Sequence, residues 1–482
     1  MRKEDLFEAL QDIDDEKILA AKGKKKAKKP VWIRWIAVAA CAAVITGVFA
    51  AVPLLRKGGQ SPAGGYPSEI GVVSAVYPEA TAVNLSAQQF MESDDHWEWW
   101  QDFRERADAS RALYGGMKQY YSELMAQTLV AEDDNPVCSP INTYIAFAML
   151  AEVTDGNTRQ QILDLLGVPD IETLRQNIKV LWEGNYADTP TLKSILANSA
   201  WLRDGYAYDA DTLARLAGDY YASSFSGVPG SEQMNGALRS WTDRNTGGLL
   251  TEYIQDMKLD SDTVFALVST IYYKAQWTAK FQQQSTSPET FHGTKGNAAV
   301  DMMHMSDMMS VYSTESFTAL GLSLMDSGSM FFYLPNEGTD VNGLASDAAV
   351  LKATEFDYND NAWSSPLVHL SVPKFSVSGS TDLIEVLQDL GITDVLDPDL
   401  ADFSPLTQES DSLFLSAANH AALVEIDEEG VTGAAYTELA VAEGAPIPDG
   451  EIDFVLDRPF MFIVTGNDGS VLFSGIVRNI EG

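Results

Sequence analysis

The chain has 482 residues, and 45% of them are hydrophobic, enough for a sizeable core in one to three domains. Its 69 Asp and Glu against 32 Lys and Arg give a net charge of −37. That balance excludes a nucleic-acid-binding protein, because phosphates must be neutralised by cations, and it argues against docking on an anionic membrane surface. Two cysteines, Cys41 and Cys138, exclude a disulfide framework, and five scattered histidines indicate no metal site.

The N-terminus differs from the rest of the chain in charge. Residues 1–57 carry 12 Lys or Arg and 7 Asp or Glu, a net of +5, so the remaining 425 residues carry −42. Residues 36–55 are uncharged and, as a helix, span about 30 Å, the thickness of the hydrocarbon layer. A Lys-rich run at 22–29 precedes them, so the positive-inside rule predicts a cytoplasmic tail at 1–35, a transmembrane anchor at 36–55 and an extracellular remainder.

Two other interpretations of the apolar segment stay open. Phe49, Ala50 and Ala51 offer small residues for cleavage of a signal peptide, which would make the protein secreted. The run from Val38 to Cys41 resembles a bacterial lipid-attachment signal. In each case most of the chain lies outside the cytoplasm, and its scarcity of cysteine favours a bacterial cell surface.

Patterning divides the remainder into a linker and a large domain. Residues 56–104 read as an extracytoplasmic linker that is rich in Gly, Pro, Ser and Ala and runs into a short aromatic helix at 96–111. Helical patterns follow from Leu113 and again after Ser139-Pro140, whereas strand-like runs gather later in the chain. Early helices and late strands indicate an α+β fold.

Sequence motifs for catalysis are missing. The chain has no GxSxG, HExxH, P-loop or GxGxxG motif, so we expect no enzyme. An EF-hand-like run at 357–361 lacks the glycine at loop position six. His420 lies in a strand-like run at 413–426, which favours a hydrogen-bonded core histidine; a Ser–His–Asp triad assembled in space is the alternative.

Eight segments in order resemble the serpins, the serine protease inhibitor family. The first is Asn135-PVCSPINTYIAFAMLAEVTDGNTRQQI-Ile162, which is similar to that family's helix B signature. The others are residues 241–248, 267–277, 372–375, 390–404, 424–430, 457–464 and 469–477. The resemblance implies a serpin domain at 105–482 with three β-sheets, eight or nine helices and an exposed reactive-centre loop.

The resemblance also implies a mechanism. A target serine protease attacks the loop as a substrate and forms a covalent acyl complex, and the cleaved loop then inserts as a strand in the largest sheet. We expect a monomer without cofactor or metal. A non-inhibitory serpin, acting as protease substrate, carrier or chaperone, is the alternative.

The loop has side chains suited to insertion. The residues that match the family's hinge are Glu428, Glu429, Gly430, Val431, Thr432, Gly433, Ala434 and Ala435. With period-two alternation, Val431, Gly433, Ala435 and Thr437 share one face, which is small or apolar. Val431, Gly433 and Tyr436 depart from the pattern of inhibitory members, and a strand glycine costs ~0.5–1 kcal/mol relative to alanine.

The scissile bond has three candidates. The family's spacing from Glu428 indicates Gly444–Ala445, small side chains favour Ala442–Glu443, and a glutamyl-specific protease would cut Glu443–Gly444. No Lys or Arg lies between Glu428 and Asp457, which disfavours trypsin-like proteases and predicts elastase-like or subtilisin-like targets.

Five further positions match structural sites of the family. The polar cluster beneath the opening sheet, the shutter, corresponds to Ser139, Asn142, Ser269 and His420. The family has Ser where this chain has Asn142 and Asn where it has Ser269, so we expect an amide and a hydroxyl to have exchanged places in a bonded network around His420. Independent drift of the two positions is the alternative. Trp277 matches the breach, at the top of the sheet.

Overall fold

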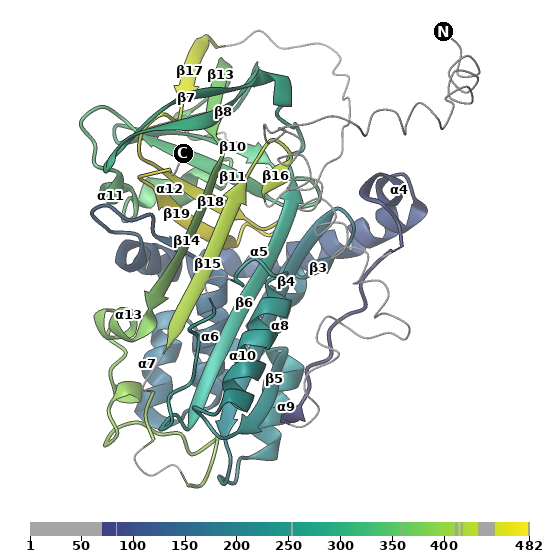
Figure 1. Cartoon of the computed structure of the whole chain (residues 1–482), viewed down its shortest axis with the longest axis vertical. Helices are drawn as coiled ribbons and strands as arrows, with labels where there is room; N and C mark the ends of the chain where they lie inside the picture. The colour runs from purple at the N-terminus through teal and green to yellow at the C-terminus, as the bar shows by residue number, and fades with distance from the viewer. Residues whose placement is uncertain are drawn as a thin grey trace, which may run out of the picture. The chain divides into compact units, whose positions relative to one another are not determined.

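Strands from both halves of the chain assemble into three β-sheets (Figure 1). The computed structural model describes residues 70–480, apart from 83, 252–253, 358, 410–412, 416–417 and 432–448. Sheet A has the order β1 (Gly71–Val73), β5 (Ala222–Gly227), β4 (Leu192–Arg203), β6 (Phe265–Gln276), β16 (Gly430–Val431), β15 (Asn419–Ile426), β14 (Phe375–Asp382), with β3 (Ala187–Asp188) beside β4.

The other two sheets lie toward the upper end of Figure 1. Sheet B has the order β12 (Trp363–Ser364), β9 (Val311–Ser313), β10 (Phe317–Ser323), β11 (Ser329–Pro335), β18 (Phe460–Thr465), β19 (Val471–Val477), β2 (Val137–Cys138). Sheet C has the order β17 (Glu451–Val455), β13 (Leu367–Pro373), β8 (Gly296–Met308), β7 (Thr286–Gly293). The predicted α+β class with three sheets is confirmed.

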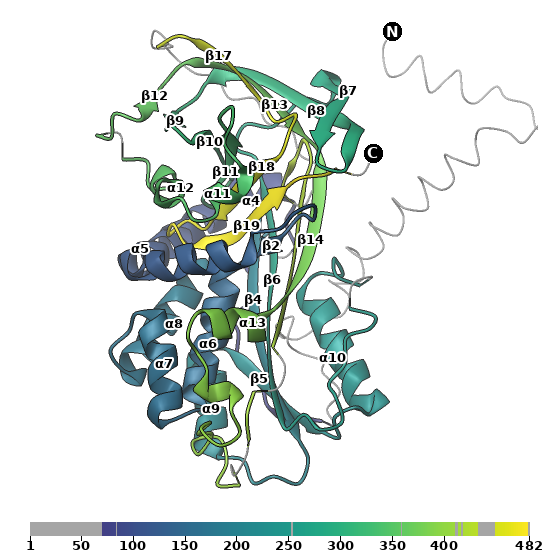
Figure 2. The same ribbon diagram turned by 90° about the vertical axis from the view of Figure 1, so that its left-hand side faces the viewer.

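Ten α-helices occur in the described part of the chain, against the eight or nine expected. They are α4 (Ala87–Met91), α5 (Asp94–Thr128), α6 (Pro140–Glu152), α7 (Gly156–Leu166), α8 (Ile171–Asn185), α9 (Ala210–Asp219), α10 (Glu232–Asn245), α11 (Val341–Leu344), α12 (Ala348–Ala353) and α13 (Leu383–Asp389); η1 (Gln283–Ser285) and η2 (Asp394–Leu396) are 3₁₀ turns. Helices α5 to α9 lie on one side of sheet A and α10 lies on the other (Figure 2).

Helix α6 forms the centre of the core. Its first residue is a proline, which suits the start of a helix because the backbone N–H that proline lacks would have no partner within the helix there. Nearly every one of its side chains is buried, because the helix packs against β6 of sheet A, β19 of sheet B and the neighbouring helix α7. A helix that is buried on nearly every side therefore joins the two larger sheets.

Helix α5 differs from the sequence prediction. We expected a short helix at 96–111 and a separate one from Leu113, but a single helix of 35 residues runs from Asp94 to Thr128. A buried stripe at Phe103, Tyr114, Met117 and Leu124 crosses the glycine pair at 115–116 without a break. Tertiary packing of this stripe outweighs the low helix propensity of the two glycines.

Residues 70–93 were assigned to the linker but pack on the domain. Gly71 in β1 pairs with Phe225 at the edge of sheet A, and the Tyr77 hydroxyl donates to the Tyr221 carbonyl at 2.9 Å. The Tyr77 ring lies 5.5 Å from that of Trp182. The described linker residues thus belong to the folded body. The segment 36–55 lies outside the described residues, and among those that are described no helix is long and apolar enough to cross a membrane.

The two glycines of α5 generate a stability prediction. Both are exposed, and a Cβ at Gly115 or Gly116 would meet no atom within 4 Å. We expect Gly115→Ala to raise the free energy of unfolding by ~0.5–1 kcal/mol, because alanine loses less backbone entropy on folding. Gly184→Ala in α8 is the control: its Cβ would lie 2.5 Å from that of Ser110, so it should destabilise. Thermal unfolding midpoints that ranked the two variants the other way would contradict this.

Candidate functional site

A tight turn joins β15 to β16. The Asp427 carboxylate accepts the amide of Glu429 at 2.8 Å and that of Gly430 at 3.2 Å, and the Asp427 amide donates to the Gly430 carbonyl at 3.1 Å. Such side-chain-to-backbone bonds are the usual way in which Asp reverses a chain. A Cβ at Gly430 would lie 2.2 Å from the Ala275 carbonyl oxygen, so only glycine fits against β6 at this point.

The turn places the first hinge residues inside sheet A. Gly430 pairs with Gln276 of β6, and Val431 pairs with both Ala275 of β6 and Ile426 of β15. The side chain of Val431 is buried. Below this pair, β6 and β15 form no direct ladder in the part of the chain that the structure describes. The hinge therefore begins a strand between β6 and β15 (Figure 1).

Glu428 anchors the turn to the start of β7 and to the residue that links β13 to β14. Its carboxylate, nearly enclosed, accepts from Lys374 Nζ and from Thr286 Oγ1, each at 2.8 Å. Burial of Glu428 opposes ionisation, but the bonds from Lys374, from its own backbone amide and from Thr286 outweigh that effect and lower its pKa. The neighbouring Glu429 pairs with Lys280 at 2.9 Å.

Trp277 closes the turn from the side of β6. Its indole Nε1 donates to the Asp427 carbonyl at 2.8 Å, and its backbone amide donates to the Glu429 carbonyl at 3.0 Å. The whole side chain is buried. The residue predicted at the breach therefore contacts the hinge directly.

The four predicted shutter residues come together from three elements. Ser139 precedes α6, Asn142 lies in its first turn, Ser269 lies on β6 and His420 on β15. Asn142, Ser269 and His420 line a cavity of about 40 Å³ between these elements and α13. The prediction of a hydrogen-bonded core histidine is confirmed, because the backbone amide of Ser139 donates to His420 Nε2 at 2.8 Å.

This bond defines the charge state of His420. Its Nε2 acts as an acceptor, so the ring is neutral with its proton on Nδ1. Burial lowers the pKa of His420 to about 4, because the charged form would lose its hydration. At neutral pH, the shutter therefore contains a neutral imidazole that accepts a backbone amide.

The rest of the expected network is not bonded. Among the described atoms, the Asn142 amide and the hydroxyls of Ser139 and Ser269 have no hydrogen-bond partner, although all are buried. An unmet buried polar group costs about 1–3 kcal/mol, and the adjoining cavity is large enough for a water molecule. The exchange of amide and hydroxyl therefore leaves polar atoms facing a cavity rather than one another.

Several predicted site residues lie outside the described residues. These are the hinge positions Thr432, Gly433, Ala434 and Ala435 and the bond candidates Ala442, Glu443, Gly444 and Ala445. Sequence reasoning, for its part, missed the roles of Asp427, Lys374 and Thr286. Asp427 had a local signal, since Asp favours turns, but nothing in the sequence connects Lys374 or Thr286 with Glu428.

Comparison with known proteins agrees with this geometry. The family model described as Serpin (serine protease inhibitor) matches residues 118–480. Serpin-ZX of Arabidopsis thaliana is 28% identical over 367 residues, which cover 73% of this chain and 93% of the plant protein. Alpha-1-antiproteinase of Rattus norvegicus is 30% identical over 368 residues, which cover 74% of this chain and 85% of the rat protein. The chain belongs to the serpin family, which is a family of serine protease inhibitors and not of enzymes.

Solved structures share the fold. The thermophilic serpin tengpin in its native state has a TM-score of 0.68 at 24% identity, covering 76% of this chain and 93% of tengpin. Arabidopsis AtSerpin1, in its native stressed conformation, has a TM-score of 0.63 at 26% identity, and the match covers 79% of this chain and 99% of AtSerpin1. In the described residues, no group of three His, Cys, Asp or Glu side chains is arranged to hold a metal ion.

His420 generates a pH prediction. Its pKa of about 4 lies below the value near 6.5 of an unfolded histidine, so its stabilising effect is complete above pH 6.5 and is lost as the pH falls toward 4. The loss amounts to about 3 kcal/mol. We expect His420→Gln, whose amide oxygen can still accept the Ser139 amide, to show a smaller drop in thermal midpoint between pH 7.5 and 4.5.

His292→Gln is the matched control, since His292 is exposed. It should follow the wild-type pH profile. An equally steep profile for His420→Gln would contradict the assignment of a neutral buried imidazole.

Proposed function

We propose that this protein inhibits serine proteases by inserting its cleaved reactive-centre loop between β6 and β15. The observation that carries the proposal is β16, which already occupies the first two positions of such a strand. Its pairing with β6 and with β15 is antiparallel on both sides. Insertion would extend a ladder that has already begun, so no new register needs to be found.

If the loop continued in the register of β16, the inserted strand would reach the shutter residues. Seven positions beyond Gly430, Thr437 would stand opposite Ser269, which lies seven positions before Gln276. Six positions beyond Val431, Thr437 would also stand opposite His420, six positions before Ile426. Both partner strands thus bring the same loop residue to the cavity beneath the sheet.

Side-chain alternation supports the same end state. Val431 faces the core, so Thr437 would face it too in a continuous strand. The Thr437 hydroxyl can both donate and accept a hydrogen bond. The unbonded amide of Asn142 and the unbonded hydroxyl of Ser269 need such a partner. Insertion would therefore satisfy polar atoms that are buried without a partner in the present structure.

Chain length explains why cleavage must come first. The 17 residues at 432–448 span at most about 58 Å when fully extended. A strand beside the 12 residues of β6 would run about 40 Å down the sheet, and an intact loop would need as much again to return to β17 in sheet C. Full insertion is thus compatible with β17 in place only after the loop has been cut. An uncut native chain is then a trapped state, held by a barrier.

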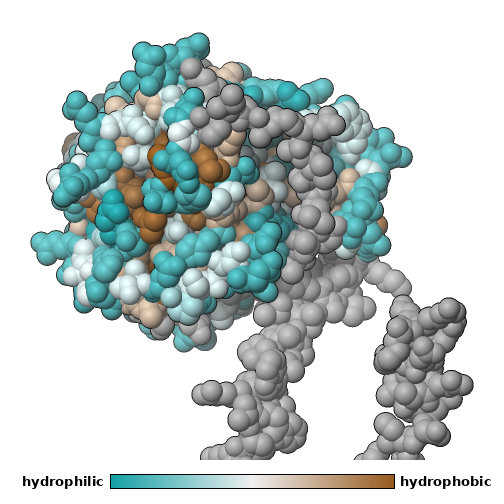
Figure 3. Space-filling model, turned by 90° about the horizontal axis from the view of Figure 1, so that it is seen from above, coloured by the Kyte–Doolittle hydropathy of each residue, from teal (hydrophilic) through white to brown (hydrophobic). Residues whose placement is uncertain are grey.

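The loop's composition supports elastase-like or subtilisin-like targets. No Lys or Arg lies between Glu428 and Asp457, and small residues surround the three candidate bonds. Figure 3 views the end of the molecule that is uppermost in Figure 1 and that contains sheet C, and it shows many hydrophilic side chains there. A net charge of −37 would steer basic proteases toward the molecule more than acidic ones.

Incubation with an elastase, a subtilisin and a trypsin tests inhibition. We expect an adduct stable in SDS with one of the first two, and mass spectrometry of the released C-terminal peptide would identify the cut bond. Thr437→Arg should abolish the adduct and leave plain cleavage, because a buried charge at the shutter blocks insertion. Glu438→Arg, on the opposite face of the strand, should retain the adduct.

Cleavage without any adduct would overturn inhibition and favour a non-inhibitory serpin. An adduct with trypsin alone would overturn the specificity. Equal loss in both arginine variants would contradict the inserted register.

We also propose display on the outer face of the cell membrane through residues 36–55. The support is the uncharged length of that segment and the Lys-rich run before it. We expect the full chain to fractionate with membranes and its serpin domain to be released from intact cells by added protease. A chain that lacks residues 36–55 should stay in the cytoplasm. Release of the intact domain into the medium would indicate signal cleavage instead.

A further inference from the structure

The two edges of sheet A are treated differently. At one edge, β1 from the N-terminal segment adds to β5, so the protein's own chain covers it. At the other edge, β14 pairs with β15 alone among the strands that the structure describes. An uncovered edge strand presents a row of peptide groups that another strand can pair with.

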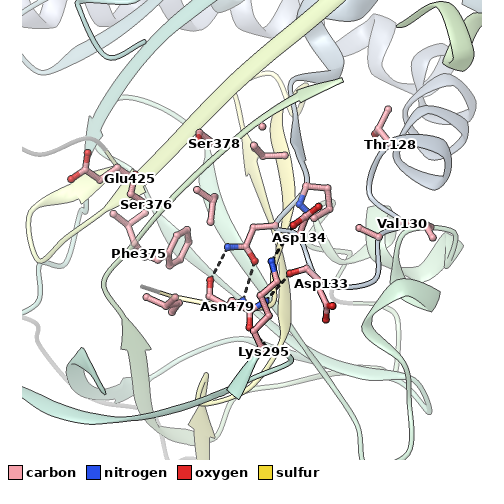
Figure 4. A pocket seen from close by; sticks show the side chains of 18 of the residues that line it. Thr128, Val130, Asp133, Asp134, Lys295, Phe375, Ser376, Ser378, Glu425 and Asn479 are labelled. Atoms are coloured by element: carbon pink, nitrogen blue, oxygen red, sulfur yellow. Dashed lines mark hydrogen bonds and ion pairs between the residues drawn. The ribbon is translucent and has the colours of Figure 1, made fainter. Parts of the chain in front are cut away.

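A groove of about 1290 Å³ runs beside β14 and reaches α13. Its walls are β14, the segment that follows α5 and the turn between β7 and β8, and Figure 4 shows Ser376 and Ser378 across from Asp133, Asp134 and Lys295. The groove continues past Gly379 to Asp382 and to Glu385 and Asp389 of α13. The stretch of the β14 edge that lines it without a break runs from Phe375 to Gly379.

This open edge lacks the usual protection. Edge strands are commonly guarded by a charged side chain, a proline or a bulge. Between Phe375 and Ser378 there is neither charge nor proline, and the ladder to β15 runs without a shift of register. The outward side chains, Ser376 and Ser378, are small, so an approaching backbone meets no steric barrier.

The groove is strongly acidic. Six carboxylates line it: Asp133, Asp382, Glu385, Asp389, Glu425 and Asp427. A seventh, Asp134, is paired with Lys295 at 3.2 Å, and the other lysine in the groove, Lys374, is committed to Glu428 at 2.8 Å. The groove thus has an open strand edge and an excess of negative charge.

We propose that this groove binds an extended, cationic peptide segment of another protein, which adds to β14 as a further strand of sheet A. Main-chain bonds to the edge would supply the geometry, and Lys or Arg side chains of the peptide would meet the carboxylates. Charge argues against the reactive loop of a second copy as the occupant, since residues 432–448 hold Glu438 and Glu443 and no Lys or Arg. The proposal is independent of protease inhibition.

Binding of labelled peptides to the full-length protein tests the proposal. We expect fluorescence anisotropy to detect Lys-Val-Lys-Val-Lys but not Glu-Val-Glu-Val-Glu. A Lys-Val-Lys-Val-Lys analogue that is N-methylated at alternate residues keeps its charge but loses strand pairing, so it should bind at least tenfold more weakly. Hydrogen exchange should slow at residues 375–378 when the unmodified peptide is bound.

Charge variants locate the site. Glu385→Gln combined with Asp389→Asn should weaken binding about fivefold, as expected for two surface charges. The control, Asp211→Asn combined with Asp399→Asn, removes two exposed charges outside the groove and should bind as the wild type does. Equal binding of the methylated peptide, equal losses in the two double variants, or unchanged exchange at 375–378 would each overturn the proposal.

Discussion

The close packing of Gly430 against the Ala275 carbonyl is the constraint on which the turn between β15 and β16 depends. It lets the chain turn at Asp427 and enter the space between β6 and β15, where any Cβ would collide with the backbone of β6. Three residues then hold that turn: Trp277 just after β6, Lys374 between β13 and β14, and Thr286 at the start of β7. The hinge is thereby aligned with the strand position between β6 and β15, whose upper end it occupies.

Below the hinge, the core is incompletely satisfied. Within the described part of the chain, the buried amide of Asn142 and the hydroxyls of Ser139 and Ser269 lack partners, and Asn142 and Ser269 line a small cavity beneath the sheet. Such atoms make the present state less stable than one in which they are bonded. Under the proposed mechanism, an inserted strand would gain driving force by bonding to these atoms. The neutral His420, bonded to the start of α6, connects β15 to the core.

The N-terminal part of the domain shows where local patterns fall short. Composition predicted a linker through residue 104, and the residue pattern predicted two helices, one at 96–111 and one from Leu113. Both expectations rested on local propensity, which is a weak effect next to the burial of Tyr77 against Trp182 or of the stripe along α5. The same segment covers one edge of sheet A, whereas nothing in the sequence of β14 signals that it has β15 as its single partner among the described strands.

The sequence by itself determined the α+β class, the serpin family and the sorting of loop side chains, because these depend on residue order and on the period of a strand. The identity of the shutter positions came with the family. Tertiary structure alone decided that Glu428 is held by Lys374 and Thr286, that Asn142 and Ser269 face a cavity, and that β16 pairs with both β6 and β15. Such facts depend on contacts between residues more than fifty positions apart, and no local pattern encodes those distances.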